Sequence, residues 1–278
     1  MPELPEVETI KRTLQQLVIG KTIEDVEIFW GNIIKRPSDQ LQFKLICQGQ
    51  TIHGVDRRGK FLKFILDENV LVSHLRMEGR YMVQKKSEPH EKHTHVIFSF
   101  TDDTELRYMD VRKFGTMHLL PKGEEDQHDP LVKLGVEPFS NEFTPDVLKK
   151  AFQKTSRTIK ATLLDQSIVV GLGNIYVDEA LFRARIHPKT MANSLSRKKL
   201  EILHREIIAT LTEAVNKGGS SVRTYVNSQG EMGMFQLEHY VYGKKGEPCT
   251  VCGTEIEKTV VAQRGTHYCP QCQKIKSA

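Results

Sequence analysis

The sequence lacks the features that mark membrane and secreted proteins. No stretch approaches the roughly 18 consecutive apolar residues that a membrane-spanning helix requires, and the acidic start MPELPEVE is unlike a signal or transit peptide. Internal repeats and low-complexity tracts are also absent. Neither charge sign dominates, because 40 Lys and Arg against 35 Asp and Glu leave a net charge of +5, which permits a nucleic-acid partner without arguing for one. We therefore expect a cytoplasmic globular protein of about two domains.

Cysteine is scarce and unevenly placed. Cys249 and Cys252 form one close pair, and Cys269 and Cys272 form a second pair after sixteen intervening residues. Two CxxC turns at this separation can present four thiolates to one ion, so the spacing predicts a single structural Zn²⁺ with no open ligand position. A redox dithiol is the alternative. The remaining cysteine, Cys47, has no His or Cys near it and is expected to be a small buried hydrophobic residue.

The first half of the chain changes from a helical to a strand-like pattern. Within residues 4–18, Val7, Ile10, Leu14 and Leu17 recur at spacings of three and four, which predicts a helix. Between residues 22 and 120 the sequence predicts strands of a sandwich or barrel, in the runs TIEDVEIF, KFLKFIL, VLVSHL, HVIFSF, ELRYMD and TMHLL. The acidic, proline-containing stretch 121–141 suits a linker, so we place a domain boundary near residue 135.

Helical periodicity returns beyond this boundary. Ser156 and Asn174 are the expected N-caps of two of the helices, which we place at about 144–153, 156–165, 174–184 and 196–217. Residues 218–239 hold four glycines and no clear period, which is typical of a lid or binding loop. The predicted domains are residues 1–135, 136–240 and 241–278.

Two glycine-containing segments in the second half admit a structural and a functional interpretation. The glycines of VVGLGN precede a helix and could either form a plain turn or direct backbone N–H groups at an anion, and Arg157 and Lys160 favour a phosphate clamp. Between the cysteine pairs, two strand-like runs meet at Arg264 and Gly265. An arginine at this tip could be solvated or could reach into a groove.

The beginning of the chain also has two interpretations. Removal of Met1 would expose Pro2 as a secondary amine with a pKa of about 8, which leaves a usable free-base fraction at neutral pH. Pro2 and the acidic residues Glu3 and Glu6 equally suit the first turn of a helix.

Six motifs resemble, in the same order, those of the formamidopyrimidine-DNA glycosylase family, also known as 8-oxoguanine DNA glycosylases. They are PELPEVETI at the start, RRGKFL at 57–62, SHLRMEGRY at 73–81, DVRKFGTM at 110–117, GNIYVDEALF at 173–182 and the terminal VVAQRGTHYCPQCQ. The chain is also similar to the sister group endonuclease VIII, which removes oxidised pyrimidines, but PELPE, Met77 and the RKF element favour the purine-directed branch. Gln263 departs from the family, which usually has glycine before the ribbon arginine, and this bears on the conformation of the ribbon tip.

The resemblance implies a bifunctional enzyme of base-excision repair. Pro2 would attack C1′ of the damaged nucleotide, displace the base and form a cationic iminium with the opened sugar. Glu3 would donate the proton that assists sugar opening, and Glu6 would support the site. Lys60 would act in the first strand cleavage by β-elimination, and Arg264 in the second by δ-elimination.

The resemblance also implies how the damaged base leaves the helix. Met77, Arg112 and Phe114 would fill the space left by the extruded base, and Arg112 opposite cytosine would explain a preference for lesions paired with C. Read without the family, Met77 and Phe114 would be core residues.

Further DNA contacts follow from the same resemblance. The backbone phosphates would be contacted by His93, Lys160, Asn174 and Arg264, and Tyr242 would help to hold the ribbon against them. Thr224 and Tyr225 in the 218–239 loop would cap the flipped purine, and Glu78 would contribute to the base pocket.

The expected fold is α+β: an N-terminal catalytic β-sandwich preceded by the helix that carries Pro2, a helical helix-two-turn-helix domain, and a zinc-ribbon β-hairpin. The expected partner is double-stranded DNA with an oxidised purine opposite cytosine, bound by a monomer in the bacterial cytoplasm near the nucleoid, because one lesion has no two-fold symmetry to match. An endonuclease VIII-like enzyme and a non-enzymatic zinc-ribbon protein that binds damaged DNA are the alternatives, and under a third, unrelated function only the zinc site would remain.

Overall fold

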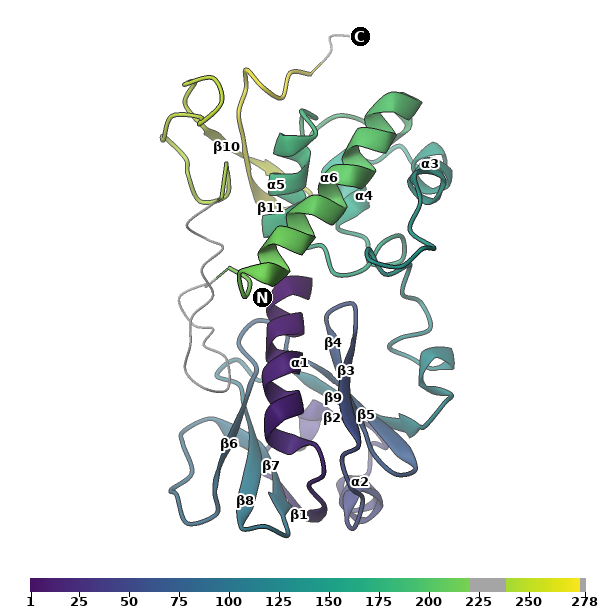
Figure 1. The fold of residues 1–278 in the computed structure, drawn as a ribbon, viewed down its shortest axis with the longest axis vertical. Helices are drawn as coiled ribbons and strands as arrows, with labels where there is room; N and C mark the ends of the chain where they lie inside the picture. Colours follow the sequence, from purple (N-terminus) through teal and green to yellow (C-terminus); the bar gives the residue numbers. More distant parts are fainter. Residues whose placement is uncertain (221–238, 276–278) are drawn as a thin grey trace. The chain divides into compact units, whose positions relative to one another are not determined.

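The computed structural model describes residues 1–220 and 239–275, which form two compact units (Figure 1). One unit comprises Met1–Val132 and the other begins at Lys133. Within these described ranges, no helix combines the length and the apolar composition that a membrane crossing needs.

The first unit contains two sheets. The four-stranded sheet has the order β1-β7-β8-β6 and the five-stranded sheet the order β2-β9-β5-β4-β3. All neighbouring strands are antiparallel except the pair β2 and β9. The strands are β1 (Ile23–Ile28), β2 (Ile34–Arg36), β3 (Gly54–Arg58), β4 (Phe61–Ile65), β5 (Asn69–His74), β6 (Arg80–Lys85), β7 (Thr94–Phe100), β8 (Thr104–Met109) and β9 (Thr116–Pro121).

A single hydrophobic core joins both sheets and the helices of this unit. It includes side chains from both sheets and from helix α1 (Leu4–Val18), where Val7, Ile10 and Leu14 are buried, so the predicted helical periodicity is confirmed. Helix α2 (Gln40–Cys47) was not among the predicted elements, and its N-cap Asp39 accepts hydrogen bonds from two backbone N–H groups. Cys47 is fully buried, and burial raises the pKa of its thiol to about 12, as expected of a hydrophobic core residue.

The second unit is helical and ends in a two-stranded ribbon. Its helices are α3 (Pro145–Gln153), α4 (Ile159–Leu163), α5 (Asn174–Arg183) and α6 (Arg197–Asn216), and its ribbon strands are β10 (Glu257–Val261) and β11 (Arg264–Tyr268). Short 3-10 helices occur at η1 (Gly31–Ile33), η2 (Glu125–Gln127) and η3 (Ala192–Ser194). The helices share a core to which α5 contributes Ile175, Tyr176, Val177, Ala180 and Leu181.

Three local predictions in this unit were wrong. Helix α4 is capped by the hydroxyl of Thr158, which accepts from the Ala161 N–H, and therefore starts later than a cap at Ser156 would place it. Helix α5 is capped by Gly173, so Asn174 is its first helical residue. The ribbon turns at Ala262 and Gln263 rather than at Arg264, because both have positive φ (49° and 58°) and Val261 pairs with Arg264. The overall class is confirmed: an α+β fold with an N-terminal helix and sandwich, a helical unit and a terminal ribbon.

Candidate active site and zinc centre

The N-terminal residues form the buried start of helix α1. Pro2 is buried, and Glu3 and Glu6 are 2% and 5% exposed. The Glu3 N–H donates to Glu6 Oε2 at 2.8 Å, which caps the helix as the structural interpretation predicted. Burial lowers the pKa of the Met1 amine; the carboxylates of Glu3, Glu6 and Glu78 oppose this shift and Lys60 supports it. These charged groups therefore surround the position where a proline amine would stand after Met1 is removed.

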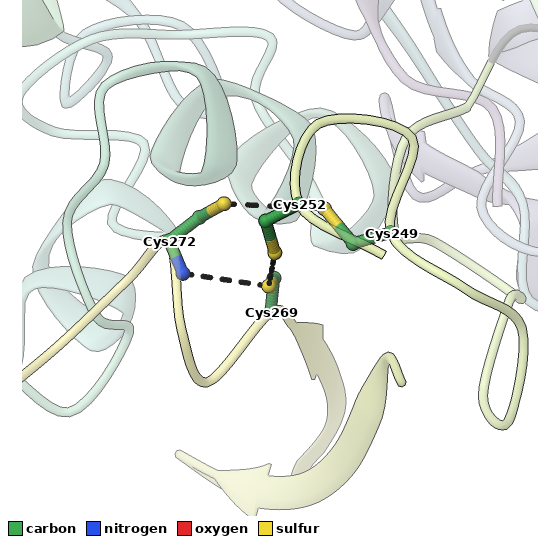
Figure 2. Close-up of side chains that lie close together, drawn as sticks. All are labelled: Cys249, Cys252, Cys269 and Cys272. Atoms are coloured by element: carbon green, nitrogen blue, oxygen red, sulfur yellow. Dashed lines mark hydrogen bonds between the residues drawn. The ribbon is translucent and has the colours of Figure 1, made fainter. Parts of the chain in front are cut away.

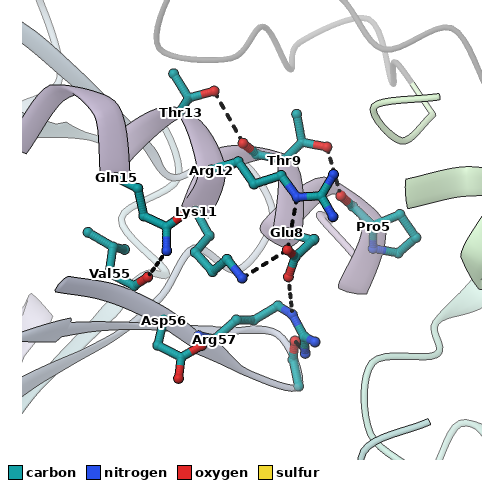
Figure 3. Close-up of polar contacts among 11 residues, drawn as sticks. Pro5, Glu8, Thr9, Lys11, Arg12, Thr13, Gln15, Val55, Asp56 and Arg57 are labelled. Atoms are coloured by element: carbon teal, nitrogen blue, oxygen red, sulfur yellow. Dashed lines mark hydrogen bonds and ion pairs between the residues drawn. The ribbon is translucent and has the colours of Figure 1, made fainter. Parts of the chain in front are cut away.

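Lys60 lies in the turn between β3 and β4 and is 6% exposed. A charged network ties this turn to helix α1 (Figure 3). Glu8 accepts from Lys11 Nζ at 2.9 Å and from Arg57 Nε at 3.1 Å, and Arg57 also donates to the Gly59 carbonyl at 3.1 Å. Burial raises the pKa of Glu8, but hydrogen bonds from Lys11 and Arg57 outweigh it and hold the pKa below its ordinary value. These contacts hold the start of α1 and the turn that carries Lys60 in a fixed position relative to each other.

The turn between β5 and β6 carries Met77, whose side chain is 38% exposed instead of buried in the core. His74 immediately precedes this turn and accepts from the Arg76 N–H through Nδ1 at 2.9 Å. Burial, with smaller contributions from Arg76 and Lys60, lowers the pKa of His74 to about 3. The neutral imidazole can therefore act as the acceptor for the first residues of the turn.

The loop between β8 and β9 carries Arg112 and Phe114. Phe114 is 52% exposed, and the Arg112 guanidinium lies 4.8 Å from the centre of its ring. Like Met77, Phe114 departs from the core position that its residue type alone would suggest. His93, immediately before β7, has a positive φ of 70°, and Lys113 has a positive φ of 60°; such backbone is uncommon outside glycine.

Lys160 and Asn174 hold the ribbon rather than lying open on the surface. The Lys160 side chain is 0% exposed, and its Nζ lies 2.6 Å from Asp178 Oδ1 and 3.4 Å from the Gly265 carbonyl oxygen. Asn174 Nδ2 donates to the same carbonyl at 2.9 Å, and Asp178 Oδ2 accepts from the His267 N–H at 2.9 Å. This buried network therefore fixes the backbone on the C-terminal side of Arg264. In this structure the Lys160 ammonium is not accessible to a phosphate.

The four paired cysteines lie together at the base of the ribbon (Figure 2). All of their Sγ atoms are within 4.8 Å of one another, with 3.5 Å between Cys252 and Cys269 and 3.9 Å between Cys249 and Cys272. Four thiolates about 2.3 Å from one ion in tetrahedral geometry would be separated by just under 4 Å. The donor set and its dimensions fit one structural zinc ion, as the spacing predicted.

Tyr242 joins the ribbon to helix α5. Its ring packs against His267 of β11 at 5.1 Å between centres, and its N–H donates to Glu179 Oε1 at 2.8 Å. Glu78 lies in the same turn as Met77 and is partly buried. Thr224 and Tyr225, with most of the 218–239 loop, lie outside the described residues.

Sequence reasoning missed the residues that support this site. Glu8 and Arg57 connect the start of α1 to the Lys60 turn, and Asp178 connects α4 to the ribbon. Glu8 and Asp178 are buried acidic residues on helices that carry quoted motifs, which was the available signal for these two. Arg57 is the first residue of the quoted motif RRGKFL.

Comparison with known proteins identifies the family. Residues 1–117 match the formamidopyrimidine-DNA glycosylase N-terminal domain, residues 134–226 match its H2TH domain, and residues 246–275 match a zinc finger found in FPG and IleRS. A formamidopyrimidine-DNA glycosylase of Cytobacillus firmus is 64% identical over 273 residues, which cover 98% of this chain and 100% of the relative.

Two solved structures of the Lactococcus lactis protein are similar over nearly the whole chain. The complex of one of its mutants with a Fapy-dG containing DNA has a TM-score of 0.93 at 43% identity, covering 99% of this chain and 100% of that one. Its complex with an abasic site containing DNA has a TM-score of 0.91 at 43% identity, covering 98% and 100%. This chain therefore belongs to the formamidopyrimidine-DNA glycosylase family and is a DNA-repair glycosylase with abasic-site lyase activity.

Proposed function

We propose that this chain excises oxidised purines, 8-oxoguanine and formamidopyrimidines, from duplex DNA and cleaves the abasic strand by β- and δ-elimination through a Schiff base on Pro2. The arrangement at the N-terminus carries the proposal: Pro2 is buried, and the charges of Glu3, Glu6, Lys60 and Glu78 all act on the amine next to it. A buried amine loses its proton more readily than a solvated one, which suits a nucleophile.

The roles of the neighbouring side chains follow from their chemistry. After Met1 is removed, the neutral Pro2 nitrogen attacks C1′ and the bond from C1′ to the base breaks, and the departing base gains the proton that the nitrogen loses. The bond from C1′ to the ring oxygen then breaks, and the opened sugar remains attached as an iminium. Glu3 gives the proton that the ring oxygen gains on opening, and Glu6 holds the first turn through the Glu3 N–H. Lys60 assists the β-elimination that releases the strand on the 3′ side.

The second unit contributes to the second cleavage. Arg264 assists the δ-elimination and contacts a DNA phosphate. Asn174, the first residue of α5, directs the start of this helix at the DNA backbone. Because its own ammonium is buried, Lys160 contributes to phosphate binding indirectly, by holding the ribbon strand that carries Arg264. Cys249, Cys252, Cys269 and Cys272 would hold a structural Zn²⁺ that keeps the ribbon closed, with all four ligand positions taken by thiolates.

The substrate is double-stranded DNA with the lesion opposite cytosine. Met77, Arg112 and Phe114 fill the helix where the base has left, and their exposure on two turns of the first unit supports this role. His93 and Tyr242 assist backbone binding, Glu78 contacts the base, and Thr224 and Tyr225 cap it. We assign catalysis to residues 1–135, DNA binding to 136–240 and zinc to 241–278. We infer that the enzyme acts as a monomer, because one lesion has no two-fold symmetry to match, and that it works in the cytoplasm near the nucleoid.

The experiment is a comparison of two duplexes, one with 8-oxoguanine opposite C and one with thymine glycol. Faster cleavage of the first, with products ending in phosphate on both sides of the gap, is the expected result. Preference for thymine glycol would favour an endonuclease VIII-like activity, and binding without cleavage of either would contradict the enzymatic proposal.

A further inference from the structure

The two turns that carry Met77, Arg112 and Phe114 have a common support. Residues 75–79 connect β5 to β6 and residues 110–115 connect β8 to β9, so both turns cross from the five-stranded to the four-stranded sheet or back. Three residues in or beside these turns, Arg76, His93 and Lys113, have positive φ without being glycine. Backbone of this kind persists only where surrounding contacts impose it.

One buried carboxylate organises the second turn. Asp110 is 1% exposed, and its Oδ1 accepts from the Arg112 N–H at 3.0 Å. Its Oδ2 accepts from the Phe114 and Gly115 N–H groups at 2.9 and 2.8 Å. Arg112 and Phe114, the two side chains of this turn that are expected to enter DNA, are therefore held through their own backbone by the same carboxylate.

The hydroxyl of Tyr108 connects this loop to the Met77 turn. Tyr108 is fully buried, and its hydroxyl donates to Asp110 Oδ2 at 3.4 Å. A Cβ atom at Gly79 would come within 2.3 Å of the hydroxyl oxygen, and one at Gly115 within 1.7 Å. The hydroxyl thus packs directly against a glycine of each turn, which fixes their separation.

We propose that Asp110 and Tyr108 are positioning residues for recognition of the opposite base: they hold Arg112, Phe114 and Met77 in one fixed arrangement before DNA binds. The inference rests on the proposed function. A prearranged Arg112 can discriminate cytosine from adenine, whereas a mobile one would contact either base and lose selectivity.

Asp110→Asn is the test, because it keeps the shape of the side chain and replaces one acceptor oxygen by a donor. Whichever way the amide is turned, an N–H group of the loop then faces an NH₂ group. Loss of one hydrogen bond to a charged acceptor should lower the equilibrium constant for the ordered loop conformation roughly tenfold. Asp39→Asn is the control, since Asp39 also accepts backbone N–H bonds in this unit, from Leu41 and Gln42, but caps α2.

The readout is the ratio of kcat/KM for 8-oxoguanine opposite C to that opposite A. We expect Asp110→Asn to lower this ratio at least about fivefold, while cleavage of a single-stranded abasic oligonucleotide, which has no opposite base, stays within about twofold. Tyr108→Phe should also lower this ratio, and it replaces Asp110→Asn as the test if that variant does not fold. An unchanged ratio in the folded variants, or an equal loss on the single strand, would overturn the proposal. Failure of the unmodified chain to cleave the lesion would instead overturn the proposed function.

Discussion

Replacing Asp178 by Asn should loosen the ribbon strand that begins with Arg264. The side chains of Asp178 and Lys160 are both 0% exposed with 2.6 Å between charged atoms, and Asp178 also binds the His267 N–H. Removing one partner of a buried ion pair typically costs about 3–5 kcal/mol, because the other charge loses its compensation away from water. If the strand opens through this contact, its amide hydrogens should exchange roughly 150 to 5,000 times faster.

The assay is hydrogen exchange over residues 264–268, measured together with the ratio of δ- to β-elimination product. Asp165→Asn is the control, because Asp165 pairs with Arg157 at 2.9 Å but both side chains are partly exposed, at 31% and 49%. Exposed pairs contribute about 1 kcal/mol or less, so this variant should exchange almost as the parent does. Equal exchange rates for residues 264–268 in the two variants would refute the reasoning. If the strand exchanges faster in Asp178→Asn but the ratio of δ- to β-elimination product is unchanged, Arg264 does not act in the second cleavage.

Three further results are expected. Cys249→Ser, or a strong chelator, should release the single zinc ion and abolish the folded ribbon, measured as metal content and as exchange in residues 249–272. Gln263→Gly should stabilise the ribbon by about 1 kcal/mol in thermal unfolding, because Gln263 has a φ of 58° that glycine adopts without strain; no gain would mean that the turn adopts another conformation. The pKa of His74 falls from 6.5 to about 3 in the folded state, so the neutral ring contributes stability that is complete above pH 6.5 and is lost as the pH falls toward 3. In His74→Phe the free energy of unfolding should therefore depend less on pH between 6.5 and 3. An unchanged pH dependence in this range would contradict the prediction.

Patterns of short range could be predicted from the sequence. The apolar spacing in residues 4–18 predicted the buried face of α1, and the two CxxC turns predicted the thiolate cluster. In each case the structure depends mainly on residues that are close together in the sequence. Helix α2 could not be found this way, since it is eight residues long and buries only Phe43 and Cys47.

Contacts between distant segments could not be predicted from the sequence. The burial of Lys160 depends on Asp178, eighteen positions later on another helix, and on the carbonyl of Gly265 in the ribbon. A lysine beside a glycine-rich turn therefore suggested an accessible phosphate ligand although it is enclosed. The exposure of Met77 and Phe114 is likewise set by turns between the sheets, and only the family resemblance indicated it. The catalytic and DNA-contacting roles remain predictions.

Borohydride trapping on a duplex with 8-oxoguanine opposite C tests the central claim most directly. The chain with Met1 removed should form a covalent adduct with the DNA, because its Pro2 nitrogen is a free secondary amine. A version with one additional residue before Pro2 should form none, because the nitrogen is then an amide. Adduct from both versions, or tight binding without adduct from either, would contradict the account.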